Sequence, residues 1–186
     1  MPATDFDIAI GWLLRKDVEG VHANDPNDKG GDTWYGISRK AQPNEPWPPT
    51  RERCIEIYRE EYWNTRNLPL DKFRSLPLKL VLFDGAVQHD PTDMAIMLQT
   101  TLNKLGGAER IVVDGWAGPQ TLIKLKAITQ FDRDRELAVA LAVLFTRQKY
   151  YYDLSRRPGQ LPNLRHWTYR MAALGELLIA RHLTAL

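Results

Sequence analysis

Residues 19–37 read EGVHANDPNDKGGDTWYGI, and this stretch decides how the N-terminal part of the chain folds. Its middle, from Asn24 to Gly31, is dense in turn-forming residues that interrupt any helical pattern. The Thr-Trp-Tyr run at residues 33–35 favours extended backbone instead. The stretch therefore predicts a short β-hairpin near the N-terminus.

Helical periodicity surrounds this hairpin on both sides. Apolar residues recur at helical spacing from about residue 5 to 18. After a proline-rich loop, Thr50 is expected to cap a helix that carries Ile55, Tyr58 and Tyr62 on one face. Later apolar stripes predict further helices over about residues 78–89, 95–105, from 119 onwards, 134–154 and 164–178. The sequence thus predicts an α+β fold that is mainly α, with a helical C-terminal half.

Composition limits the classes of protein. The chain has 186 residues, of which 44% are hydrophobic and 10% aromatic, which suffices for a packed core. A net charge of +2 is too small to indicate nucleic-acid binding. It suits an anionic polymer such as a bacterial cell wall, although from charge alone an ordinary solvated surface is the better explanation. We expect neither a cleavable signal nor a stable membrane insertion.

Several kinds of catalytic chemistry have no motif in this chain. Cys54 is the only cysteine, so an internal disulfide and a cysteine-rich zinc site are both excluded. The four histidines form no His-Glu-x-x-His pattern, and we find no Gly-x-Ser-x-Gly elbow or phosphate loop. No metal and no cofactor are expected. A cysteine–histidine amidase or protease remains an alternative, although Cys54 lies beside an apolar helix face, where a packed thiol is expected.

Two carboxylates and a hydroxyl in the opening stretch suit the cleavage of a glycosidic bond. That reaction needs an acid for the leaving oxygen and a second group for the attack, separated by roughly 6.5–9.5 Å when a water attacks. Glu19, near a helix end with apolar neighbours, is our candidate for the protonated acid. Asp28 would stay ionised in its polar turn, and Thr33 would orient the water. Taken singly, each also has an ordinary structural interpretation as a surface, turn or strand residue.

The same stretch resembles glycoside hydrolase family 108, whose motif runs Glu-Gly-Gly, a spacer, Asp-x-Gly-Gly-x-Thr and Tyr-Gly-Ile. This resemblance implies a lysozyme-like fold and an N-acetylmuramidase of phage or bacterial origin. It places the catalytic glutamate on Glu19. The Glu-Asp-Thr order is also similar to that of phage lysozymes, which carries the water-handling roles over to Asp28 and Thr33.

The chain departs from the family pattern at Val21, where a second glycine is expected, at His22, where a tyrosine is common, and at Gln88, where we expect asparagine. No departure removes a predicted catalytic group. Four further side chains are candidates for substrate binding, with core packing or ordinary surface polarity as the alternative. They are Trp34 and Tyr35, which would stack on sugars, and Gln88 and His89, which would reach the glycan.

The second half carries a weaker resemblance, to the predicted peptidoglycan-binding region that usually follows in this family. Its matching pieces are FDGAVQ at residues 83–88, the Leu98-Gln99 pair, and DGWAGPQTL at residues 114–122. We therefore expect a lysozyme-like catalytic region over residues 1–75 and a helical peptidoglycan-binding region over residues 76–186. The two are expected to pack as one globular unit.

These inferences together predict a monomeric, antimicrobial phage endolysin that cleaves the β-1,4 bond between N-acetylmuramic acid and N-acetylglucosamine. Its partners would be peptidoglycan glycan strands and no nucleic acid. It would wait in the cytoplasm until a holin opens the inner membrane, and it would then act on periplasmic peptidoglycan and lyse the host. Two alternatives stay open: a non-catalytic peptidoglycan-binding or secretion accessory protein, and a lytic transglycosylase, which needs only the acid Glu19.

Overall fold

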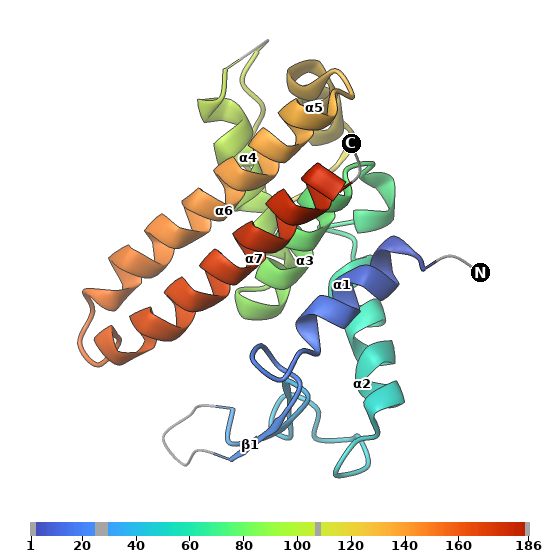
Figure 1. Ribbon diagram of the computed structural model, residues 1–186, viewed down its shortest axis with the longest axis vertical. Helices are drawn as coiled ribbons and strands as arrows, with labels where there is room; N and C mark the ends of the chain where they lie inside the picture. The colour runs from blue at the N-terminus through green and yellow to red at the C-terminus, as the bar shows by residue number, and fades with distance from the viewer. Residues whose placement is uncertain (1–2, 25–29, 107–108, 185–186) are drawn as a thin grey trace. The chain divides into compact units, whose positions relative to one another are not determined.

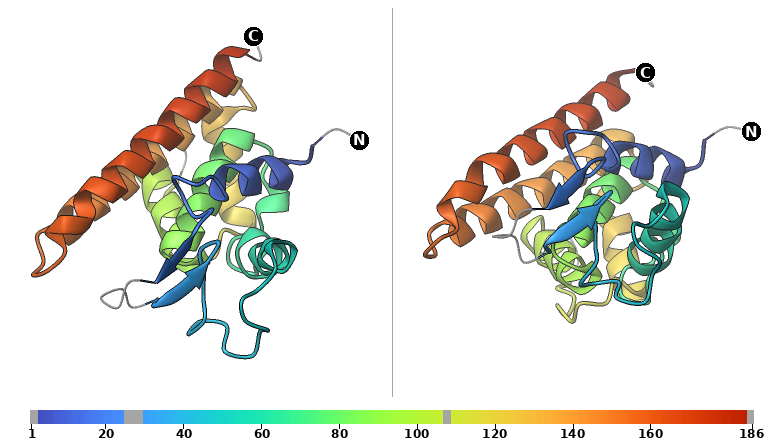
Figure 2. Two further views of the ribbon diagram at one scale, coloured as in Figure 1. Left: turned by 60° about the horizontal axis from the view of Figure 1, so that its bottom comes forward. Right: turned by 90° about the horizontal axis from the view of Figure 1, so that it is seen from below.

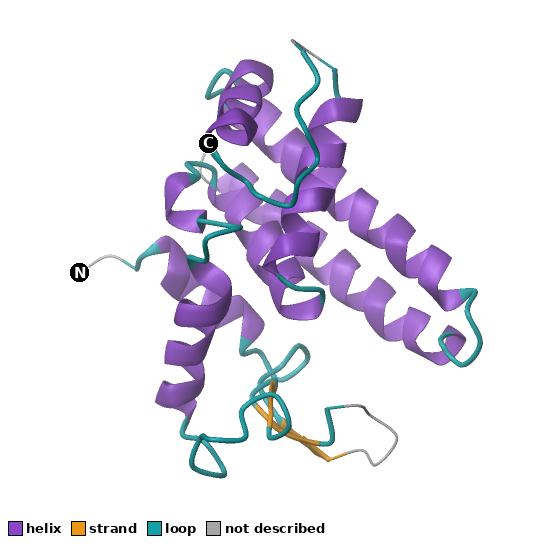
Figure 3. Cartoon of the chain, turned by 180° about the vertical axis from the view of Figure 1, so that it is seen from behind, coloured by secondary structure: helices purple, strands orange, loops and turns teal. Residues whose placement is uncertain are grey.

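The computed structural model describes residues 3–24, 30–106 and 109–184. Helices dominate these residues, and one small antiparallel sheet lies near the N-terminus (Figures 1 and 3), so the predicted α+β, mainly α class is confirmed. The α-helices are α1 (Asp5–Leu13), α2 (Arg51–Tyr58), α3 (Leu76–Gln88), α4 (Pro91–Lys104), α5 (Pro119–Thr129), α6 (Arg133–Ser155) and α7 (Leu164–Thr184). The strands are β1 (His22–Asn24), β2 (Asp32–Trp34) and β3 (Ile37–Ser38).

The chain divides into two compact units, Met1–Trp63 and Asn64–Leu186, which we call the N-terminal unit and the C-terminal unit. Short single-turn elements connect the main helices. They are the π-helical turn η1 (Arg59–Trp63) and the 3-10 turns η2 (Leu70–Lys72) and η3 (Leu161–Asn163).

Helix α1 begins at a capping box and ends earlier than the sequence predicted. The Thr4 hydroxyl accepts a hydrogen bond from the Asp7 amide, and the Asp7 carboxylate accepts one from the Thr4 amide. The helix stops at Leu13 rather than near residue 18. Beyond it, the Arg15 carbonyl accepts hydrogen bonds from the amides of Val18 and Gly20, so the chain closes into turns instead of continuing the helix.

The sheet confirms the predicted hairpin, whose strands appear as arrows in Figure 2. It also contains a third strand, β3. Strand β2 pairs antiparallel with both neighbours, with Trp34 opposite His22 on one side and Ile37 on the other. Tyr35 and Gly36 join β2 to β3 with φ angles of 51° and 78°. Two successive positive φ angles define the tight hairpin turn whose twist matches the strands that it joins.

Aromatic side chains fill the core of the N-terminal unit. Phe6 of α1 meets Trp63 edge to face at a ring distance of 5.2 Å, and the Arg59 guanidinium covers the Phe6 ring at 3.9 Å. Helix α2 begins as predicted, because the Thr50 hydroxyl accepts a hydrogen bond from the Arg53 amide at 3.1 Å. This core holds α1 and α2, the two helices that flank the hairpin in the sequence.

The C-terminal unit packs helices around α3, which contacts α4 and α6, while α6 and α7 run side by side along their lengths (Figure 1). A buried carboxylate links three of these helices. Asp84 of α3 binds Arg147 of α6 and Arg170 of α7, each at 2.9 Å. Burial alone raises the pKa of Asp84, but the two guanidinium groups outweigh it and bring the pKa down to about 2. No helix in the described ranges is long and apolar enough to span a bilayer.

Candidate active site

Glu19 lies in the turn between α1 and β1, where its side chain is half-buried. Its amide donates to the Leu13 carbonyl at 3.0 Å, which ties the turn to the end of α1. Gly20 makes this turn possible, because a Cβ at that position would stand 2.2 Å from the Leu14 carbonyl oxygen. The backbone therefore fixes where Glu19 leaves the helix end.

The β2–β3 turn lies against the Glu19 side chain. An added Cβ on Gly36 would stand 3.0 Å and 3.1 Å from the Cβ and Cγ atoms of Glu19, and 2.3 Å from the Tyr58 hydroxyl. Since Gly36 also has a φ of 78°, glycine is required there on two counts. The structure thus brings the predicted acid and the hairpin into contact.

Thr33 occupies the middle of β2, between Ala23 of β1 and Ser38 of β3. Its hydroxyl donates to the Gly31 carbonyl at 3.1 Å, which leaves the oxygen able to accept a hydrogen bond. Asp28, the predicted second carboxylate, lies outside the described residues. The roles assigned to Thr33 and Asp28 therefore stay predictions.

Trp34 and Tyr35 lie on the hairpin as predicted, both half-buried. Trp34 is already stacked on one side, because the His22 ring lies 4.4 Å from it at an interplanar angle of 23°. The departure at His22 therefore supplies a ring that packs on Trp34. Tyr35 lies in the turn that contacts Glu19, directly before Gly36, whereas Trp34 lies one residue further from that contact.

Asp32 is a carboxylate that the sequence analysis did not single out. One of its oxygens binds His22 Nε2 at 2.9 Å, and the other accepts from Trp47 Nε1 at 2.7 Å. These two hydrogen bonds lower the pKa of Asp32 below its usual range. Strand alternation places Asp32 and Trp34 on one face, but no sequence signal pointed to Trp47, which reaches Asp32 from the proline-rich loop.

Gln88 and His89 belong to the C-terminal unit, at the end of α3. Gln88 Oε1 accepts a hydrogen bond from the Tyr151 hydroxyl at 3.4 Å. The His89 ring lies 5.0 Å from the rings of both Tyr150 and Tyr151, and its Nε2 is buried without a hydrogen bond to any described residue. Burial, reinforced by Arg147, lowers the pKa of His89 to about 4. Their predicted contact with glycan stays a prediction.

The described residues give little support to other chemistries. Cys54 is fully buried, and burial raises the pKa of its thiol to about 11, so it is protonated rather than a poised nucleophile. Within the described ranges, no three His, Cys, Asp or Glu side chains gather as a metal site would require.

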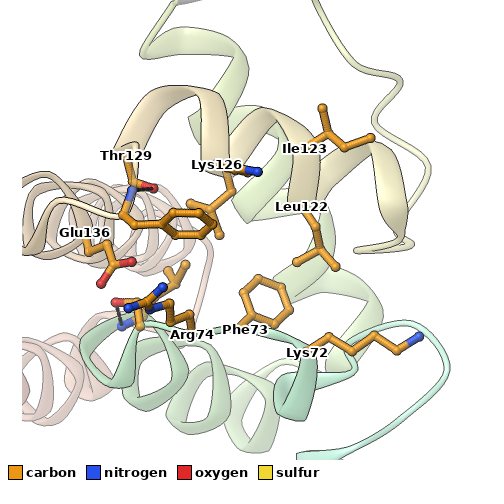
Figure 4. A pocket seen from close by; sticks show the side chains of 12 residues that line it. Lys72, Phe73, Arg74, Leu122, Ile123, Lys126, Thr129 and Glu136 are labelled. Atoms are coloured by element: carbon orange, nitrogen blue, oxygen red, sulfur yellow. Dashed lines mark hydrogen bonds between the residues drawn. The ribbon is translucent and has the colours of Figure 1, made fainter.

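Two of the hollows among the described residues of the C-terminal unit stand out by their lining. One, of about 260 Å³, is lined mainly by apolar groups, and Arg74 and Lys126 flank the exposed ring of Phe131 there (Figure 4). The carboxyl of Glu136 faces this hollow, and burial raises its pKa. A larger one, of about 630 Å³, lies beside Trp116. No residue predicted to be catalytic lines either hollow.

Comparison with known proteins places this geometry in a class. The model of the family described as Glycosyl hydrolase 108 matches residues 14–89, a segment that includes Glu19, the whole sheet and α3. A solved structure, "Structure of Brucella abortus SagA", superposes with a TM-score of 0.68 at 22% sequence identity, covering 94% of each chain. No curated protein matches the sequence of this chain.

The family match supports the class of glycoside hydrolases, and the structural match shows a lysozyme-like, mainly helical fold. Because the glycosyl hydrolase family 108 model matches residues 14–89, the resemblance carried by the opening stretch is confirmed. The SagA likeness extends the shared fold over nearly the whole chain, including the helical second half.

Proposed function

We propose that this chain is an N-acetylmuramidase that hydrolyses the β-1,4 bond between N-acetylmuramic acid and N-acetylglucosamine in bacterial peptidoglycan. The observation that carries the proposal is Glu19, held by the backbone at the end of α1 and in contact with the Gly36 turn, within the family 108 segment. A half-buried carboxyl beside a glycine-lined turn is suited to meet a bulky sugar and donate a proton.

In this mechanism Glu19 protonates the bridging oxygen as the bond from the N-acetylmuramic acid C1 carbon to that oxygen breaks. A water forms the new bond to C1 and gives its proton to Asp28, while Thr33 accepts a hydrogen bond from the water. Attack from the face opposite the leaving group inverts the configuration at C1. Trp34, Tyr35, Gln88 and His89 are the proposed contacts to the sugars.

The biological setting is also part of the proposal. The motif resemblance supports a phage endolysin, a monomer that waits in the cytoplasm, passes a holin-opened membrane and degrades periplasmic peptidoglycan. The peptidoglycan-binding role proposed for residues 76–186 would hold the enzyme on its polymer. The mild net charge of +2 is compatible with an anionic polymer of this kind.

Mass spectrometry of muropeptides released from purified Gram-negative sacculi tests the reaction. We expect products with reducing N-acetylmuramic acid ends from the parent protein. Glu19→Gln should release them roughly 10²- to 10⁴-fold more slowly, because the general acid is lost. Glu52→Gln, an exposed carboxylate on α2, is the matched control and should act at the parent rate.

Three results would redirect the proposal. Full activity in Glu19→Gln would show that Glu19 is not the general acid. Anhydro ends, together with an unaffected Asp28→Asn variant, would make the protein a lytic transglycosylase. Protein that pellets with sacculi but releases nothing would be a binding module.

A further inference from the structure

Tyr58 of α2 is a core residue whose hydroxyl reaches the hairpin. Its side chain is 1% exposed, and its Oη donates to the Tyr35 carbonyl at 2.9 Å. The helical pattern accounts for the burial of the ring, since it lies on the apolar face of α2. Packing of a ring does not require a hydroxyl, so the polar atom needs a separate explanation.

The hydroxyl of Tyr58 and the side chain of Glu19 meet at one point of the β2–β3 turn. Both lie within 3.0 Å of the place where a Cβ on Gly36 would stand, with Tyr58 Oη at 2.3 Å and Glu19 Cβ at 3.0 Å. Tyr35, a residue with a side chain, adopts a φ of 51° in this turn. A conformation of this kind persists only when its surroundings hold it, and the hydrogen bond to the Tyr35 carbonyl does so.

We propose that Tyr58 is a positioning residue for Glu19, a role that rests on the proposed function of Glu19 as the acid. The hydroxyl fixes the Tyr35–Gly36 turn, and the turn forms one wall against the Cβ and Cγ atoms of Glu19. The hydrogen bond from the Glu19 amide to the Leu13 carbonyl also holds the Glu19 backbone in place. Tyr58 thereby limits the carboxyl to the positions from which it protonates the glycosidic oxygen.

The expected effect falls on the chemical step. A misplacement of about 1 Å in a reacting group costs roughly 10²-fold in rate, even when the cause lies away from the reacting atoms. Of the four proposed contacts to the glycan only Tyr35 lies in this turn, so the Michaelis constant should change much less than the rate of the chemical step. A purely structural tyrosine would change stability and leave both constants of the folded enzyme as they are.

The test compares Tyr58→Phe with Tyr62→Phe, assayed on solubilised peptidoglycan over a range of concentrations. Tyr62 is the matched control because its half-buried ring packs 5.7 Å from that of Tyr58 and its exchange also removes one hydroxyl. For Tyr58→Phe we expect kcat to fall roughly 10- to 100-fold with KM within twofold of the parent. The melting temperature should fall by about 5 °C or less. Tyr62→Phe should keep both constants.

A folded Tyr58→Phe with parental kcat overturns the proposal, and so does a loss that appears only in KM. Gly36→Ala covers the case in which Tyr58→Phe does not fold, because it displaces the same turn from within. A folded Gly36→Ala should also lose kcat, and unchanged kcat in that variant counts against the proposal. Glu19→Gln separates the proposed function of Glu19 from the positioning role of Tyr58. If Glu19→Gln is fully active, the proposed function fails. If it is inactive while Tyr58→Phe is normal, only the positioning role fails.

Discussion

The two units of the molecule hold their key carboxylates in opposite ways. Glu19 in the N-terminal unit is half-buried, fixed by backbone hydrogen bonds and by contact with a glycine turn. Asp84 in the C-terminal unit is completely buried and neutralised by two arginines from other helices. A carboxyl that must reach substrate needs a fixed backbone and an accessible tip. One that joins helices needs fixed charge partners and no solvent.

This contrast predicts that substitutions at Asp84 act on stability. Asp84→Asn would leave two buried guanidinium groups facing a neutral amide, so the free energy of unfolding should drop by about 3–5 kcal/mol. Urea unfolding measures the change. Asp153→Asn is the control, because Asp153 makes an exposed ion pair with Lys149 and should change stability by less than about 1 kcal/mol. If Asp84→Asn were as stable as the parent but could not cleave peptidoglycan, Asp84 would not have the purely structural role that distinguishes it from Glu19.

His89 makes the stability of the C-terminal unit depend on pH. Its pKa of about 4 in the folded protein lies below the ordinary histidine pKa of 6.5, so the unfolded chain binds the extra proton first as pH falls. The free energy of unfolding should therefore decline between about pH 6.5 and pH 4, by roughly 3 kcal/mol.

Urea titrations of the parent at pH 7, 5.5 and 4.5 would record this decline, and His89→Gln should flatten it. His182→Gln serves as the control, since His182 pairs with the exposed Asp134 at a helix end. A decline of the same size in His89→Gln would assign it to other groups.

The smallest effect is expected at the hairpin. Trp47→Phe removes the indole donor to Asp32 and should lower stability by about 1 kcal/mol. Hydrogen exchange should accelerate at the amides of β1 and β2, where Asp32 also binds His22. Trp116→Phe, in the C-terminal unit, should leave those amides unchanged. Unaltered exchange in Trp47→Phe would mean that Asp32 does not need Trp47 to hold the hairpin.

Local patterns predicted most of the fold. Thr50 caps α2 and Pro119 begins α5, because capping residues act within a few positions of themselves. Tyr35, for which extended backbone was predicted, instead lies in the turn between β2 and β3 with a φ of 51°. The predicted end of α1 near residue 18 was wrong. The turn after Leu13 depends on hydrogen bonds to carbonyls, which hydrophobic periodicity does not reveal.

By itself, the sequence determined the mainly helical α+β class, the hairpin and the family 108 segment that carries Glu19. Each of these depends on residues that are close together in the sequence. Only the tertiary structure decided which distant groups meet. Tyr58 reaches the turn at Glu19, Trp47 binds Asp32, and two arginines neutralise Asp84. These contacts join residues far apart in the chain, and their energies depend on burial and direction, which spacing along a sequence does not encode.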